Sequence, residues 1–218
     1  MTDHDLAQIQ LAIYADAPPS PDYWSHLGTG DMVYGIRRAE YAEHGSVDVI
    51  CFRGSVTFKD WLLDFAAFAD PFIHSGLGPV HPGFYAGMDI AWQQIRAISR
   101  APRIVIGHSL GAARAAVLTG LMVLDGQAPV QRVVWGEPKS GFKPFASLIS
   151  SVPTRSYRNA VGGHHDLVTD VPLSFPPEEY VHAGKLIDMC SPPGPEIREK
   201  FGIFALHHMP LYVAGMPQ

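Results

Sequence analysis

The chain has 218 residues, of which 47% are hydrophobic and 17% are charged, and it carries a formal net charge of -5 at neutral pH. This length suits one domain with a sizeable core, and an acidic balance without a basic stripe argues against nucleic acid as a partner. No apolar run reaches the roughly 20 residues of a membrane-spanning helix, so no transmembrane span is expected.

The N-terminus and the cysteines indicate the compartment. Residues 1–5 are polar and acidic, unlike the basic and apolar regions of a secretory signal peptide. Cys51 lies in an apolar segment and Cys190 in a proline-rich one, so no disulfide is expected between them. The expected location is therefore cytoplasmic, with secretion by another route as the alternative.

The first part of the chain alternates helical and extended patterns. Apolar residues at helical spacing predict an amphipathic helix over 5–16, which a pair of prolines ends. Two segments rich in β-branched residues, 32–36 and 47–52, are separated by the turn 43–46 and predict an antiparallel pair. A further helix is expected over 88–99, before a proline.

From about residue 100 onward, strand and helix patterns alternate regularly. In order, the sequence predicts a strand over 103–106, a helix to about Leu124, a strand over 131–135, a short helix over 144–149, a strand over 154–159, an edge strand over 181–187 and a terminal helix over 201–214. Such alternation predicts an α/β protein whose mixed, mostly parallel sheet is covered by helices on both faces. Because no repeat, low-complexity tract or linker interrupts it, we expect a single domain over 1–218.

The most informative motif is the pentapeptide Gly107-His108-Ser109-Leu110-Gly111. A β-branched strand precedes it and an alanine-rich helix follows it. In this G-x-S-x-G pattern, a sharp turn between strand and helix exposes the serine hydroxyl at the top of a sheet. A Cβ atom at either glycine would clash in so tight a turn. The motif therefore predicts that Ser109 is a nucleophile.

A catalytic serine needs an acid and a base. Its hydroxyl attacks a carbonyl only when a base takes the proton and a carboxylate orients that base. In enzymes with this turn, the acid and the histidine follow the serine in the chain. Asp166 comes after a predicted strand and a Gly162-Gly163 break, where such a sheet places its active-site loops. Asp166 is therefore the favoured acid, and Asp170 is its rival.

The candidate bases are the histidines that follow the serine, namely His164, His165, His182, His207 and His208. The predicted strand around His182 gives that residue a structural role, whereas His207 and His208 lie near the C-terminus, where one of them can be the base. Histidines and Asp166 are also zinc ligand types. However, neither an H-E-x-x-H nor a C-x-x-C spacing is present, so no metal site is expected.

Four blocks of the chain, taken in order, resemble the class 3 (fungal-type) lipase family of α/β-hydrolases. They are Phe52-Arg53-Gly54-Ser55 with Asp60-Trp61 and Asp64; Val80-His81-Pro82-Gly83-Phe84; residues 107–112; and residues 135–141 followed by Arg158-Asn159, Asp166-Leu167-Val168 and Pro172. The blocks lie within residues 47–212. The chain departs from secreted members of the family because it shows no signal sequence, and because Lys139 and Trp135 replace the usual arginine and Phe or Tyr.

The resemblance implies a fold and a catalytic triad. The fold is that of an α/β-hydrolase, and the triad is Ser109 as nucleophile, Asp166 as orienting acid and a C-terminal histidine as general base. The H-x-M-x-x-Y ending of many family members fits this chain with His207 in the catalytic place and Tyr212 at the end. His208 remains the alternative base. No cofactor is implied.

The resemblance also implies an oxyanion hole and a lid. Ser55 matches the family's oxyanion residue, and Leu110 would give the second backbone N–H. The lid would span residues 55–70, either as a mobile cover or as a helix packed permanently on the sheet. Asp64 matches a position thought to hold the Ser55 hydroxyl, or else it is a surface carboxylate. The candidate substrate and lid residues are Phe58, Trp61, Leu62, Asp64, Phe65 and His108.

The expected function is that of a serine hydrolase that cleaves acyl esters of lipids, of the triacylglycerol lipase type. Short soluble esters and phospholipid acyl chains are alternative substrates. Outside this class, the alternatives are a peptidase and a non-catalytic binding protein on a hydrolase scaffold. The expected partners are a lipid or small ester substrate and, transiently, a lipid interface.

Overall fold

The computed structural model describes residues 1–14, 27–29, 32–55, 70–174 and 179–217. Its helices are α1 (Asp3–Ala12), α3 (Pro82–Tyr85), α4 (Met88–Ile98), α5 (Leu110–Leu124), α6 (Lys143–Ile149), α7 (Pro195–Phe201) and α8 (Met209–Gly215), with 3-10 helices over Leu167–Asp170 and Gly202–His207. Its strands are β1 (Leu27–Thr29), β2 (Met32–Tyr41), β3 (Gly45–Phe52), β4 (Phe72–His74), β5 (Gly78–Val80), β6 (Arg103–His108), β7 (Gln131–Trp135), β8 (Thr154–Val161), β9 (His164–His165) and β10 (Leu186–Met189).

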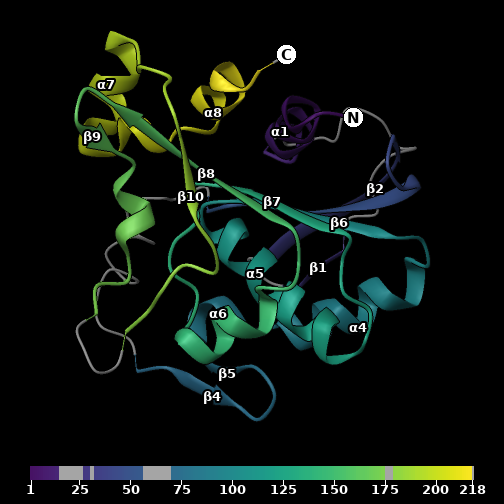
Figure 1. The fold of residues 1–218 in the computed structure, drawn as a ribbon. Coiled ribbons are helices and arrows are strands. Elements are labelled where there is room, and N and C mark those ends of the chain that lie inside the picture. The colour runs from purple at the N-terminus through teal and green to yellow at the C-terminus, as the bar shows by residue number, and fades with distance from the viewer. Residues whose placement is uncertain (15–26, 30–31, 56–69, 175–178, 218) are drawn as a thin grey trace.

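A mixed sheet forms the centre of the molecule (Figure 1). Within the described residues its strand order is β1-β2-β3-β6-β7-β8-β10, and β9 pairs with β8 beside this path. The β1–β2 and β2–β3 pairs are antiparallel, whereas β3, β6, β7, β8 and β10 run parallel. Because parallel strands end at one edge of a sheet, the loops after β3, β6, β7 and β8 gather there, where α/β sheets place their ligands.

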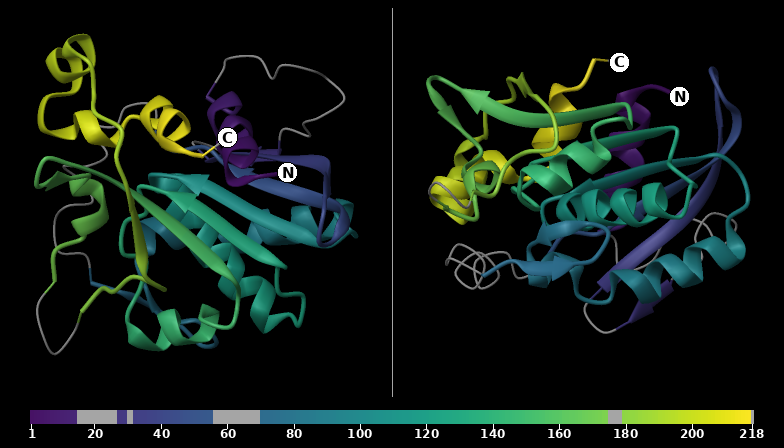
Figure 2. Two further views of the ribbon diagram at one scale, coloured as in Figure 1. Left: turned by 45° about the horizontal axis from the view of Figure 1, so that its top comes forward. Right: turned by 60° about the horizontal axis from the view of Figure 1, so that its bottom comes forward.

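Helices cover both faces of the sheet. The views of Figures 1 and 2 agree that α1 and α8 lie on one face and that α4, α5 and α6 lie on the other. The arrangement confirms the predicted α/β sheet with helices on both sides. None of the helices in the described ranges is long and apolar enough to cross a membrane.

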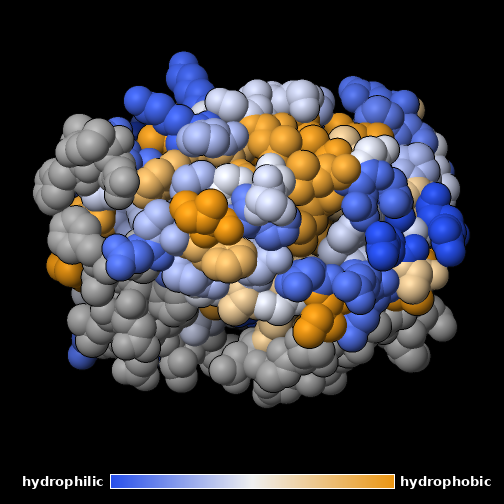
Figure 3. Space-filling model, turned by 90° about the horizontal axis from the view of Figure 1, so that it is seen from below, coloured by the Kyte–Doolittle hydropathy of each residue, from blue (hydrophilic) through white to orange (hydrophobic). Residues whose placement is uncertain are grey.

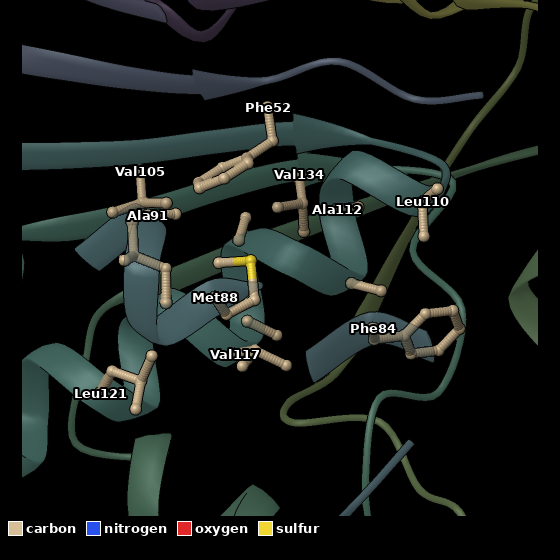
Figure 4. Packing of buried hydrophobic residues seen from close by; sticks show 14 of the residues in the cluster. Phe52, Phe84, Met88, Ala91, Val105, Leu110, Ala112, Val117, Leu121 and Val134 are labelled. Carbon is tan, nitrogen blue, oxygen red and sulfur yellow. The ribbon is translucent and has the colours of Figure 1, made fainter. Parts of the chain in front are cut away.

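Two hydrophobic cores follow from strands that are buried on both sides. Successive side chains of a strand point to opposite faces, so Val105 of β6 packs in the core under α4 and α5, while Ile104 and Ile106 pack in the core under α1 and α8. Figure 4 shows the first core, in which Phe52 and Val105 point from the sheet toward the helices. Burial on both faces explains why these strands read as continuous apolar runs.

The side of the molecule that carries α4, α5 and α6 also keeps some apolar side chains at its surface. Figure 3 views the molecule from below and shows hydrophobic areas among hydrophilic ones. The exposed apolar side chains on α4, α5 and β4 are Ile90, Ile98, Leu124, Phe72 and Ile73. Some exposed apolar surface is ordinary for a globular protein.

Helix α1 is tied to the sheet at its start. Thr2 caps it with a capping box shared with Asp5, which satisfies backbone N–H groups that a helix start leaves unpaired. The Asp3 carboxylate accepts hydrogen bonds from Arg155 and from the Tyr157 hydroxyl, the latter at 2.5 Å. Both partners belong to β8, so α1 is fixed to a strand more than 150 positions later in the chain.

Most predicted elements are confirmed, and two are wrong. The predicted antiparallel pair is β2–β3, and the strand over 131–135 has the predicted bounds. The predicted edge strand over 181–187 is instead β10, and Val181 forms only an isolated bridge with Gly141. The predicted terminal helix over 201–214 is instead divided into a 3-10 helix over Gly202–His207 and α8 over Met209–Gly215, and α7 ends at Phe201 just before them. The predicted helix breaks because Gly202 has a φ of 57°, and because Pro210 would clash inside a continuing helix.

The buried histidine His81 is expected to make the stability of the fold depend on pH. The residue is 2% exposed, and its ring centre lies 4.2 Å from that of Phe84. Burial lowers the pKa of His81 from 6.5 to about 4. Between these values the unfolded chain binds the proton and the folded chain does not, so unfolding is favoured as the pH falls below about 6.5. We expect His81 to lower the free energy of unfolding by roughly 2 kcal/mol between pH 7.5 and 5.

Urea denaturation at these two pH values measures the effect. In a His81→Gln variant, the loss of stability on acidification should shrink by that amount. His44 is exposed, so His44→Gln is the matched control. It should lose as much stability on acidification as the wild type. If His81→Gln lost as much stability on acidification as the wild type, burial of His81 would not be the cause of that loss.

Candidate active site

Ser109 occupies the turn between β6 and α5. Its φ of 61° makes it the sole residue other than glycine with a positive φ in the described ranges, a conformation that costs energy and marks functional turns. Its N–H donates to the carbonyl oxygen of Trp135 at 3.1 Å. The residue is 1% exposed, and Oγ has no hydrogen-bond partner among the described residues. The turn therefore holds a serine hydroxyl that the fold itself does not use.

The two glycines of the motif are required by close contacts. A Cβ atom on Gly107 would overlap the backbone of Gly111, and one on Gly111 would overlap the carbonyl group of Phe52. Both obstacles are main-chain atoms, which cannot move aside as a flexible side chain could. The predicted clash at both positions is confirmed. It also shows why α5 can begin directly against the end of β3.

Asp166 follows the β8–β9 hairpin and is 1% exposed. Its carboxylate accepts three hydrogen bonds: from His207 Nδ1 at 2.6 Å, from the Tyr212 hydroxyl at 2.5 Å and from the Val168 N–H at 3.0 Å. Such a network satisfies a buried carboxylate. The rival acid, Asp170, instead lies 2.8 Å from His165 Nε2.

The environment keeps Asp166 ionised. Burial raises the pKa of its carboxyl, but the charge of His207 and the hydrogen bonds from His207, Tyr212 and Val168 outweigh burial, so the pKa lies below 3.8. An ionised carboxylate only accepts hydrogen bonds, so Nδ1 of His207 carries the hydrogen. The other nitrogen, Nε2, is then the one that can take a proton from a nucleophile.

Gly136 makes room for this acid–histidine pair. It follows β7 directly with a φ of 55°. A Cβ atom there would lie 2.7 Å from both Asp166 Oδ2 and His207 Cε1. The Trp135-Gly136 block therefore needs glycine at this position, because any other side chain would clash with the Asp166–His207 pair.

The structure distinguishes the two adjacent histidines. His207 ends the 3-10 helix and is 4% exposed. His208 is half-buried, and its ring stacks on Phe201 at 4.8 Å. Burial, and then the nearby charges of Lys200 and His207, lower the pKa of His208. The bond to Asp166 is made by His207.

Ser109 and His207 open on a common cavity of about 240 Å³. Ser55 and His108 also line it. The remaining lining residues are mostly apolar and come from both ends of the chain: Leu11, Tyr14, Phe201, Phe204, His208, Met209 and Pro210. An apolar cavity with a few convergent polar groups is the usual form of a small-molecule site.

The expected oxyanion residues also lie at this place. Ser55 comes shortly after β3 and lines the cavity, and Leu110 is the first residue of α5. The N–H groups in the first turn of a helix lack intrahelical partners, and the helix dipole favours negative charge there. The start of α5 therefore suits an oxygen that becomes negative during a reaction.

The other predicted site residues are divided by the structure. Phe58, Trp61, Leu62, Asp64 and Phe65 lie outside the described residues, as does most of the expected lid. His108 lines the cavity, but both of its ring nitrogens are engaged with the protein, which the sequence did not indicate.

Tyr14 was not predicted as part of the site. Its partner His108 lies 94 positions away, so no local spacing could have indicated the contact.

His182, which was predicted to have a structural role, bonds through Nε2 to the carbonyl oxygen of Thr169 at 2.8 Å. No three His, Cys, Asp or Glu side chains of the described ranges are grouped so that they could hold a metal ion.

Comparisons with known proteins give the family and the fold of the chain. A family model described as Lipase (class 3) matches residues 49–175, more than half of the chain. A comparison with curated proteins finds no match.

Solved structures resemble the fold. A lipase from Rhizopus microsporus var. chinensis has a TM-score of 0.61 and 20% identity, over 78% of this chain and 68% of that one. A triacylglyceride lipase from Rhizomucor miehei has a TM-score of 0.52 and 23% identity, over 68% of this chain and 58% of that one. A triacylglycerol lipase whose catalytic centre is described as a serine protease triad has a TM-score of 0.51 and 23% identity, with the same two coverages. These similarities confirm the α/β-hydrolase fold.

Proposed function

Since the chain belongs to the class 3 lipase family and is thus a carboxylic ester hydrolase, we propose that it cleaves acyl ester bonds of lipids with Ser109 as nucleophile, His207 as general base and Asp166 as the acid that orients His207. One observation carries this proposal. The hydrogen-bonded Asp166–His207 pair and the buried Ser109 hydroxyl meet at one apolar cavity. The Rhizomucor relative, described as a triacylglyceride lipase, supports the choice of a lipid ester.

In the first half of the reaction the enzyme is acylated. His207 Nε2 takes the proton from Ser109 Oγ as this oxygen attacks the ester carbonyl carbon. The imidazolium that forms is stabilised by the carboxylate of Asp166. The carbonyl oxygen becomes negative and is received by the backbone N–H groups of Ser55 and Leu110, each worth roughly 3 kcal/mol in the transition state.

In the second half the acyl group is released. His207 gives its proton to the leaving alcohol oxygen, and the carbon–oxygen bond breaks. Water then enters, loses a proton to His207 and attacks the acyl-enzyme through the same oxyanion intermediate. As the bond from the acyl carbon to Ser109 Oγ breaks, His207 returns its proton to Oγ, so the products are a carboxylic acid and the free Ser109 hydroxyl.

The cavity favours an acyl chain but also supports a second candidate. Leu11, Phe201, Phe204 and Met209 give it apolar walls, which suit a hydrocarbon chain. Its volume of about 240 Å³ lies below the roughly 300–1,000 Å³ of sites for drug-sized ligands. The second candidate is therefore a carboxylesterase that acts on short, soluble esters.

Initial rates on p-nitrophenyl esters from acetate to palmitate test the proposal. We expect hydrolysis that depends on Ser109 and is fastest for acyl chains longer than butyrate, because burial of each added methylene in the apolar cavity is favourable. A maximum at acetate or butyrate would favour the carboxylesterase. Absence of hydrolysis at every chain length would contradict both candidates, and hydrolysis of p-nitroanilide amides at similar rates would indicate a peptidase.

A further inference from the structure

A chain of three hydrogen bonds links the loop before Ser55 to the backbone of His207. The Gly54 N–H donates to the Tyr14 hydroxyl oxygen at 3.0 Å. The same hydroxyl lies 2.7 Å from His108 Nδ1. On the other side of the ring, His108 Nε2 lies 2.9 Å from the carbonyl oxygen of His207.

Chemistry fixes the direction of every bond in this chain. A carbonyl oxygen only accepts, so Nε2 of His108 must carry the hydrogen. In a neutral imidazole the other nitrogen, Nδ1, is then an acceptor. The Tyr14 hydroxyl therefore donates to Nδ1, while its oxygen accepts from Gly54. One proton arrangement satisfies all the donors and acceptors, so the chain has a single polarity.

The surroundings keep both side chains neutral. Burial, and then the nearby charge of His207, lower the pKa of His108 well below 6.5, and burial raises the pKa of Tyr14. The rings of His108 and His207 are stacked with their centres 4.5 Å apart. Since His207 becomes positive during the proposed reaction, a neutral ring beside it avoids charge repulsion.

Three segments of the chain meet at the Tyr14 hydroxyl: the N-terminal segment, the end of β3 and the turn that carries Ser109. A Cβ atom on Gly54 would overlap the Tyr14 hydroxyl and would lie 2.7 Å from the His108 carbonyl oxygen and 3.0 Å from the Ser109 Cβ atom. Gly54 precedes the expected oxyanion residue Ser55, and His108 precedes the serine. The N-terminal segment therefore touches the strand end and the nucleophile turn at the same point.

We propose that Tyr14 is a positioning residue for catalysis: through Gly54 on one side and His108 on the other, it sets where the Ser55 amide and His207 lie relative to Ser109. The inference rests on the proposed roles of Ser109 and His207. Asp166 holds the His207 side chain, whereas the hydrogen bond from His108 holds its main chain. A shift of the base or of an oxyanion amide by about 1 Å can cost up to a hundredfold in rate.

The variant Tyr14→Phe tests this role because it removes one oxygen and keeps the ring. We expect kcat on a p-nitrophenyl ester to fall about tenfold while KM changes less than about twofold, since the substrate-binding walls stay in place. Tyr157→Phe is the matched control. It also removes a hydroxyl that ties α1 to the sheet, through Asp3, but it lies outside the chain of hydrogen bonds. It should lower Tm and leave kcat unchanged.

Variants of His108 test the direction of the bonds. In His108→Gln, the amide nitrogen can donate to His207 and the amide oxygen can accept from Tyr14, so we expect most of the activity to remain. The leucine of His108→Leu can neither donate nor accept, so kcat of this variant should fall at least as far as that of Tyr14→Phe. In the double variant Tyr14→Phe/His108→Leu, kcat should fall no further than in His108→Leu alone, because residues of one network are not additive.

A spectroscopic readout separates this inference from the proposed function. Long-range ¹H–¹⁵N NMR spectra of the histidine rings should show His108 as the Nε2–H tautomer in the wild type, and its Nδ1 signal should shift in Tyr14→Phe. A wild type without Ser109-dependent hydrolysis would overturn the function. Hydrolysis with kcat of folded Tyr14→Phe within twofold of the wild type, or with an equal fall in Tyr157→Phe, would overturn the positioning role. An Nδ1–H tautomer of His108 would also overturn it.

Discussion

Replacement of Ser109 by alanine should lower kcat on p-nitrophenyl esters by on the order of 10⁵-fold. The reason is that the proposed acyl-enzyme forms through Oγ, and alanine has no side-chain oxygen that can carry the acyl group. Initial rates at a saturating concentration of the ester measure this loss of kcat. The fold should persist, because Oγ has no hydrogen-bond partner among the described residues and its removal leaves no buried group unsatisfied.

Two controls make this result specific. Ser150→Ala removes an exposed hydroxyl that bonds to the Ser147 carbonyl oxygen at 2.7 Å, and it should keep wild-type kcat. A p-nitrophenyl phosphonate should add its phosphonyl group to the wild type and not to Ser109→Ala, as mass spectrometry would detect. Labelling of Ser109→Ala, or kcat within tenfold of the wild type, would contradict the nucleophile.

The parts of the site that the sequence predicted are those with a local signal. The G-x-S-x-G turn needs its glycines because the clashing atoms lie within the turn or just beside it, at Gly111 and Phe52. The strand over 131–135 was predicted with its observed bounds because five β-branched, aromatic or long side chains are buried in a row. For Gly107 and for this strand, the physical cause and its sequence pattern occupy the same few residues, whereas Gly111 is constrained by Phe52 from a distant strand.

The parts that were missed depend on contacts between distant segments. Tyr14 looked like one apolar position of an amphipathic helix, and its role depends on His108, which is 94 positions away. β10 was misplaced because its parallel pairing with β8, rather than an alternating pattern of its own, fixes where it begins. A single sequence does not show which distant residues will meet.

The break of the expected terminal helix has a functional consequence. In a continuous helix, the side chains of His207 and His208 would project from the helix surface in adjacent directions. Instead, the 3-10 helix ends at His207 and α8 begins at Met209. The change of direction turns His207 toward Asp166, which comes from the loop after β9. Gly202 begins the 3-10 helix that carries His207, and Pro210 lies in the first turn of α8. Both residues were visible in the sequence, but their effect on His207 was not.

The two adjacent histidines should respond very differently to replacement. We expect His207→Ala to lower kcat by on the order of 10⁴-fold or more, because the base that takes the Ser109 proton is lost. His208→Ala should change kcat less than about fivefold, since its ring stacks on Phe201 and makes no bond to Asp166. Initial rates, normalised to the folded fraction from circular dichroism, measure both effects.

This pair of variants tests the geometry rather than the presence of a histidine at the cavity. Both histidines line it, and the bond to Asp166 is what distinguishes His207. His207→Ala also removes one of the three hydrogen-bond donors to the buried Asp166, so Tm should fall, although Tyr212 and Val168 still donate to the carboxylate. If His208→Ala proved the more damaging in kcat, His208 would have to reach Ser109 without the orienting carboxylate. The Asp166–His207 pair would then stabilise the fold and take no part in proton transfer.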